Sequence, residues 1–241
     1  MSVKKPYYRI IRYGHAGHDD YILDERYAED RFVLCQAYKL IEDDLKKIFE
    51  FIEPANRNRN VYSHRLYELF LRCATEFESN CKRILFANGY RKSDNLGIKD
   101  YQKINAATRL SSYQLRLNIW HPNPKTFRPF KDWTKGHTLG WYKDYNNVKH
   151  DRYANFEKAS LVNVINAVSA VFSILFAQFN SYSLNPYTDQ LVFHSTDDNF
   201  LYTENSLFSI RPFANWKKSE RYSFDWNKIK DLPDSFQRYR F

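Results

Sequence analysis

Glycine, proline and sulfur are scarce in this 241-residue chain, which contains 6 Gly, 8 Pro, 3 Cys and 1 Met. Scarce glycine argues against a glycine-rich loop that cradles phosphates. The P-loop, G-x-G-x-x-G, G-x-S-x-G and H-E-x-x-H motifs do not occur in the sequence. P-loop ATPases, Rossmann dehydrogenases and serine hydrolases therefore have no support. The cysteines Cys35, Cys73 and Cys81 match no zinc-ligand spacing, so we expect buried free thiols in a reducing cytoplasm.

Signals for export or membrane insertion are also lacking. The basic stretch from Met1 to Arg12 has no apolar core of the kind that a signal peptide needs. The segment from Ala159 to Phe179 is uncharged, but only one arc of the expected helix is apolar, and the other carries serine, asparagine and glutamine. A lipid-spanning helix has no need of such a polar arc. We therefore expect a core helix, no membrane association and a cytoplasmic location.

Aromatic and basic residues, in contrast, are abundant. Aromatic residues make up 18% of the chain, hydrophobic residues make up 43%, and the formal net charge is +9. This hydrophobic content is sufficient for a large core. A basic, aromatic-rich globular chain is a candidate for a polyanionic partner, although charge alone does not determine the fold.

Helical periodicity dominates the middle of the chain. We predict helices over residues 25–53, with Asp24 as N-cap and Pro54 as the stop, and over 62–87, 98–110, 141–152 and 159–180. A short strand is expected over 114–119, followed by a loop over 120–133. In the helix over 62–87, the apolar spacing predicts eight inward positions: Leu66, Leu69, Phe70, Cys73, Phe77, Cys81, Ile84 and Leu85.

The predicted architecture is mainly α. It comprises an irregular segment over 1–24, a bundle of four or five helices over 25–180, and an aromatic-rich C-terminal appendage over 186–241 that is extended or β. Leu191–Phe193 and Leu207–Ile210 are candidate strands of this appendage. Its mixture of aromatic and basic residues suits base stacking or a protein interface. The simplest expectation is an arm that packs on its own bundle or on a dimer mate.

A polar and aromatic stretch, Trp141–Arg152, immediately precedes the apolar final helix. On a helix, Asn146 and His150 lie one turn apart, and Lys143 joins the same stripe. Histidine moves protons near neutral pH, and a neighbouring cation stabilises negative charge that develops on phosphate oxygens. This combination suits cleavage of a phosphodiester with the help of a ribose 2′-hydroxyl, and it requires no metal. The alternative is that Asn146 and His150 only tie the helix junction together.

The long paired helices over 25–53 and 62–87, followed by N-x-x-x-H and a long apolar helix, resemble the HEPN superfamily of α-helical domains. The resemblance covers about residues 25–180. The family pattern is an arginine, then four to six residues, then histidine, often with a polar residue directly after the arginine. Asn146 matches the polar position and His150 the histidine, but Tyr145 stands at the arginine position. Lys143 and Arg152 are the nearest substitute cations.

The resemblance implies a metal-independent endoribonuclease without a cofactor, of the kind found among toxins and antiviral defence effectors. His150 would act as general base or acid, Asn146 would orient it or the substrate, and Lys143 or Arg152 would stabilise the phosphate charge. The implied partners are RNA, a second copy in a homodimer, and an antitoxin or defence-system protein. Some family members lack activity. Because Tyr145 stands at the arginine position, a non-catalytic module that binds nucleic acid or protein is the alternative.

Two further groups of residues are candidate sites. Arg57, Arg59 and Arg65 surround the start of the second long helix, and with Lys149 they are candidates for phosphate contact. A solvated loop explains the three arginines equally well. His15 and His18 precede two aspartates and have the chemistry of metal ligands, but a surface loop is the favoured interpretation. We therefore expect no metal site.

Overall fold

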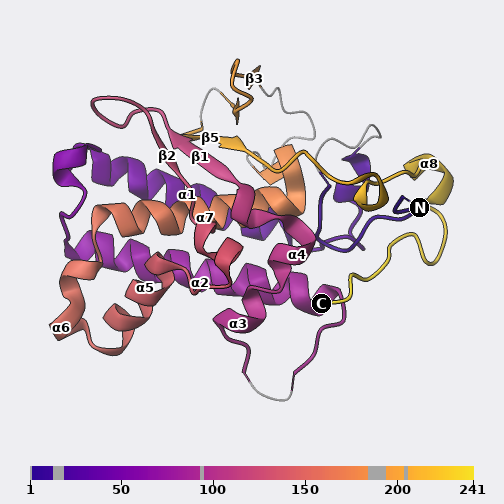
Figure 1. Ribbon diagram of the computed structural model, residues 1–241, viewed down its shortest axis with the longest axis horizontal. Coiled ribbons are helices and arrows are strands. Elements are labelled where there is room, and N and C mark those ends of the chain that lie inside the picture. Colours follow the sequence, from indigo (N-terminus) through magenta and orange to yellow (C-terminus); the bar gives the residue numbers. More distant parts are fainter. Residues whose placement is uncertain (1, 13–18, 93–94, 184–193, 204–205) are drawn as a thin grey trace.

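The computed structural model describes the chain except for residues 1, 13–18, 93–94, 184–193 and 204–205 (Figure 1). The candidate ligands His15 and His18 and the candidate strand Leu191–Phe193 lie outside the described residues. The described residues form a mainly α protein with one antiparallel five-stranded sheet.

Three long helices form the centre of the molecule: α1 (Arg31–Phe49), α2 (His64–Ala87) and α7 (Leu161–Phe179). In Figure 1, α7 runs between α1 and α2, and it packs on both. Helix α2 starts where Ser63 Oγ accepts a hydrogen bond from the backbone N–H of Leu66 at 3.2 Å, a standard N-cap. All eight positions predicted to face inward on this helix are buried, so its apolar face is confirmed.

Helix α7 is buried on almost every side. Ser169, Ser173 and Gln178 on its polar arc have no exposed surface. The helical stretch Leu161–Ser183 is long and apolar enough to cross a membrane, but 83% of its most apolar window is buried within the protein. That burial is typical of a core helix. The cysteines of α1 and α2 are likewise buried and free, and burial raises the pKa of the Cys35 thiol to about 12.

The first long helix is shorter than predicted. It begins at Arg31 and not at residue 25, so the expected N-cap at Asp24 is wrong. The Asp24 carboxylate binds the side chain of Arg26 instead, and a 3₁₀ turn, η1 (Asp19–Leu23), precedes it. Tyr27 turns inward, and its hydroxyl donates to the backbone oxygen of Gln178 at 2.6 Å. These contacts require an irregular backbone over the residues expected to start the helix.

The helix expected over 98–110 is also divided. The structure has α3 (Ile98–Tyr101), α4 (Ile104–Thr108) and the 3₁₀ turn η3 (Leu110–Ser112). Between the last two, Arg109 adopts a left-handed φ of 58°, which a helix does not accommodate. Its guanidinium reaches Glu220 at 2.6 Å. The expected loop over 120–133 contains a strand, β2 (Lys125–Phe127), and its last residues begin the 3₁₀ turn η4 (Lys131–Lys135).

The sheet joins the middle of the chain to its C-terminal part. The strand expected over 114–119 is present as β1 (Gln114–Leu117), with Leu115 and Leu117 buried. The strand order is β2-β1-β5-β4-β3, with β3 (His194–Ser195), β4 (Leu201–Tyr202) and β5 (Phe208–Arg211). β5 confirms a strand within Leu207–Ile210, and it pairs with β1.

The two ends of the chain pack on the same core as the helices. Val3 forms a parallel bridge with Tyr222, and Tyr7 forms one with Gln237. The C-terminal part also contains the 3₁₀ turn η7 (Lys218–Glu220) and α8 (Trp226–Ile229). Buried residues of these segments, including Ile10, Tyr222, Trp226 and Phe236, belong to the hydrophobic cluster that contains α2 and α7.

Candidate nucleic-acid interface

The polar stretch before α7 folds as α5 (Gly140–His150), α6 (Arg152–Asn155) and the 3₁₀ turn η5 (Phe156–Lys158). The buried residues of α5 are aromatic or apolar: Trp141, Tyr142, Tyr145 and Val148. On the opposite side, Lys143 and His150 are exposed and Asn146 is half-buried. At 100° per residue, these last three positions share an arc of about 60°. The helix therefore presents the predicted stripe to solvent.

Tyr145, at the position where the family arginine is expected, belongs to the core. It is 3% exposed, and its ring packs edge-on against Phe70 of α2 at a centroid distance of 6.1 Å. Burial together with the Glu78 carboxylate raises the pKa of Tyr145, and the neighbouring Lys149 opposes that rise. Glu78 also accepts a hydrogen bond from Tyr142 at 2.9 Å. This position supplies no cation to the surface.

Lys149 lies in the last turn of α5, and its side chain turns back toward Tyr145. Its Nζ lies 5.4 Å from the centroid of the Tyr145 ring, and the hydrogen bond with Tyr145 raises the pKa of Lys149. Lys149 and His150 form the last turn of α5, where the helix dipole favours positive charge. Lys149 is thus an exposed cation with a fixed position beside His150.

The turn after His150 is built by Asp151. Its carboxylate accepts from the backbone N–H of Ala154 at 3.1 Å and caps α6. Arg152 then lies over Tyr67 of α2, with 5.6 Å from the guanidinium carbon to the ring centroid. The next side chain, Tyr153, is 99% exposed.

The loop between α1 and α2 that carries Arg57 and Arg59, here called the arginine loop, lies against this turn. It contains the 3₁₀ turn η2 (Asn56–Asn58), and its backbone hydrogen-bonds to the start of α7: Leu161 donates to Val61 at 2.8 Å and Val162 donates to Arg59 at 3.0 Å. Phe156 then packs against three rings of the loop and of α2, with centroid distances of 5.4 Å to Tyr62, 4.9 Å to His64 and 6.0 Å to Tyr67. Two groups of residues that are about 90 positions apart in sequence are therefore brought together.

We call the surface formed by residues 55–67 and 149–158 the basic end; it lies around α6, on the left in Figure 1. It has two acidic residues, Asp151 and Glu157, against six basic ones, which gives a formal charge of +4 with histidine neutral: Arg57, Arg59, Arg65, Lys149, Arg152 and Lys158. Its aromatic residues were not among the predicted site residues: Tyr62, Tyr67, Tyr153 and Phe156. The signal for them in the sequence is that they interrupt polar, basic stretches.

The other three predicted catalytic residues lie at different distances from His150 along the chain. His150 and Arg152 flank the turn between α5 and α6, and Asn146 lies one turn back on α5. Lys143 lies seven residues before His150, about 10 Å along the helix axis. Arg152 is therefore nearer than Lys143 to His150 along the chain.

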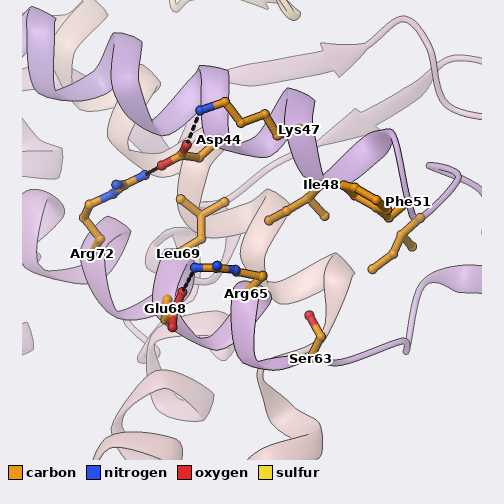
Figure 2. A pocket seen from close by; sticks show the side chains of 10 residues that line it. Asp44, Lys47, Ile48, Phe51, Ser63, Arg65, Glu68, Leu69 and Arg72 are labelled. Atoms are coloured by element: carbon orange, nitrogen blue, oxygen red, sulfur yellow. Dashed lines mark hydrogen bonds and ion pairs between the residues drawn. The ribbon is translucent and has the colours of Figure 1, made fainter.

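Arg65 faces a different feature, a groove between α1 and α2 (Figure 2). The groove has a volume of about 660 Å³ and an apolar lining that includes Ile48, Leu69 and the 86% exposed Phe51. Its charged rim is paired within the chain: Arg65 lies 2.9 Å from Glu68, and Asp44 binds both Lys47 and Arg72. Arg65 is thus already engaged, unlike the predicted phosphate contacts Arg57 and Arg59, for which the structure records no side-chain partner among the residues it describes.

Comparisons of the chain with protein-family models, with curated proteins and with solved structures give no match. Among the described residues, no three His, Cys, Asp or Glu side chains are grouped so as to hold a metal ion. The groups that this surface offers are two imidazoles, those of His64 and His150, together with cations and exposed aromatic rings.

Proposed function

We propose that this chain is a metal-independent endoribonuclease of HEPN type, with its site at the turn between α5 and α6. One observation carries the proposal: His150 is exposed beside Arg152 in a surface where five basic residues outnumber two acidic ones, even with Arg65 set aside because it pairs with Glu68. RNA is a polyanion that such a surface attracts. An imidazole is the side chain best suited to move a proton near neutral pH.

The chemistry is cleavage by the ribose 2′-hydroxyl. His150 takes the proton of that hydroxyl as the 2′-oxygen forms a bond to the adjacent phosphorus. The bond from phosphorus to the 5′-oxygen breaks, the 5′-oxygen takes a proton from solvent, and His150 releases to solvent the proton that it took. The products are a 2′,3′-cyclic phosphate and a 5′-hydroxyl. Arg152 stabilises the negative charge on the phosphorus oxygens, and Asn146 orients His150 or the ribose. Lys143 and Lys149 hold neighbouring phosphates.

The openness of the site supports a second copy of the chain as partner. The stripe Lys143–Asn146–His150 faces solvent, and a homodimer that pairs two α5 helices would enclose it and supply a second set of cations. The family resemblance implies this arrangement. It also implies a role as a cytoplasmic toxin or antiviral effector, restrained by an antitoxin or defence-system partner.

The second candidate is a nucleic-acid-binding module without catalytic activity. It is favoured by Tyr145, which occupies the arginine position and is buried in the core. On this hypothesis the basic end binds RNA, and His150 contributes only contact.

The deciding experiment is RNA cleavage in EDTA. Wild type, His150→Ala and His137→Ala are incubated with total RNA and with tRNA. His137 is a matched control because it is exposed and lies before the opposite end of α5, about 15 Å away along the helix axis. Cleavage by wild type and His137→Ala, but not by His150→Ala, is the expected result. No cleavage by any folded variant overturns the ribonuclease and leaves the binding module.

A further inference from the structure

The ring of Tyr153 is exposed to solvent on the short helix α6. None of the four residues of α6 is buried. The turn is fixed by polar bonds: Asp151 caps α6 at Ala154 N, Asn155 Nδ2 donates to the backbone oxygen of Asp151 at 2.9 Å, and Lys158 Nζ donates to Asn155 Oδ1 at 2.6 Å. A tyrosine ring that is 99% exposed is available to stack on a planar group.

The neighbours of Tyr153 are those of a phosphate site. It directly follows Arg152, and His150 is three residues away, so their Cα atoms lie within about 11 Å of each other. Tyr62, which is 49% exposed, presents a second ring on the adjoining loop. Base–aromatic stacking next to backbone cations is the usual way in which proteins hold unpaired nucleic acid.

We infer that Tyr153 is a stacking platform for one unpaired base of an RNA strand and that it positions the flanking phosphate at Arg152 and His150. The inference rests on the proposed use of the basic end as an RNA site. A base within a duplex is already stacked on both faces and paired, so it offers no free face to the ring. Tyr153 therefore restricts productive binding to unpaired segments.

Binding measurements in a His150→Ala background test the inference without interference from cleavage. The probes are a fluorescein-labelled 12-nucleotide oligouridine and a labelled 12-base-pair RNA duplex, measured by anisotropy in EDTA. The variants are Tyr153→Ala, Tyr153→Phe and, as control, Phe86→Ala. Phe86 is 43% exposed near the far end of α2, about 33 Å along that helix from His64.

Tyr153→Ala is expected to bind oligouridine about 5- to 100-fold more weakly, the effect of losing one stacked base. Tyr153→Phe and Phe86→Ala are expected to stay within about twofold of the parent, because the first keeps the ring at the site and the second alters a remote one. Duplex binding is expected to be equal in all variants. The inference is overturned if Tyr153→Ala binds oligouridine like its parent, if Tyr153→Phe is as weak as Tyr153→Ala, or if duplex binding falls equally.

Failure of the inference and failure of the proposed function give different results. If wild type cleaves RNA through His150 but Tyr153→Ala leaves oligouridine affinity unchanged, the stacking role is wrong and the ribonuclease stands. If no variant cleaves but oligouridine binding still depends on the ring at position 153, the stacking role stands and the ribonuclease is wrong. If neither RNA binds at low salt, both are overturned.

Discussion

The side-chain amide of Gln178 donates a hydrogen bond to Oδ1 of Asn80 at 2.8 Å in the buried interface between α7 and α2. Its amide oxygen accepts from Arg9 at 3.3 Å, and its backbone oxygen accepts from the Tyr27 hydroxyl at 2.6 Å. One residue of α7 therefore joins α2, the N-terminal segment and the turn before α1.

The Gln178→Ala substitution is expected to destabilise the protein by about 2 to 4 kcal/mol. It leaves polar atoms of Asn80 and Arg9 buried without this partner, which costs more than the hydrogen bonds themselves contribute. Asn166→Ala is the control, since Asn166 is half-buried and, among the described residues, its side chain binds only Val162 O within its own helix; we expect a loss of about 1 kcal/mol or less. Urea unfolding followed by circular dichroism measures both, and equal losses would contradict the prediction.

Some elements of this fold can be predicted from the sequence and others cannot. The eight inward positions of α2 could be predicted because they follow the helical period, which is a local property. The start of α1 could not, because Asp30, at its N-terminus, binds Arg9 and Arg83 from other segments. The pairing of β1 with β5 joins residues about 90 positions apart. Periodicity carries no information about such distant partners.

The same distinction applies to the candidate site. The stripe Lys143–Asn146–His150 could be predicted from spacing within one helix. The basic end as a whole could not, because backbone bonds from Leu161 and Val162 to the arginine loop create it. The inward direction of Tyr145 also depends on Phe70 and Glu78, which belong to another helix.

The Tyr145→Phe substitution is expected to leave RNA cleavage unchanged and to lower stability by about 1 kcal/mol. The substitution removes only the hydroxyl beside Glu78 and Lys149, and the ring, which packs on Phe70, is retained. Tyr145→Ala should cost about 3 to 5 kcal/mol because it opens a cavity. Cleavage in EDTA and urea unfolding are measured together. Loss of cleavage in a stable Tyr145→Phe protein would show that the hydroxyl acts in the chemistry.

Stability is expected to fall steeply at alkaline pH because of buried tyrosines. Burial raises the pKa of each of five tyrosines above 10: Tyr21, Tyr27, Tyr38, Tyr113 and Tyr222. Above pH about 10 the unfolded chain loses phenolic protons that the folded chain keeps, so the free energy of unfolding decreases as pH rises. Tyrosinate absorbance at 295 nm should appear together with the loss of helical circular dichroism. Titration of most tyrosines at pH 10 in a fully folded protein would contradict this account.

The Arg57→Ala/Arg59→Ala double variant tests whether the arginine loop contacts the RNA backbone. Each phosphate contact with a single strand contributes about 0.7 to the slope of log binding constant against log salt. Losing two contacts should make the slope for oligouridine shallower by about 1.4, with weaker binding at low salt. Lys217→Ala/Lys218→Ala is the control, since it removes the same charge from exposed positions outside the basic end. If net charge alone matters, both double variants should change the salt slope equally. If an RNA strand binds along the basic end, only the arginine variant should change the slope.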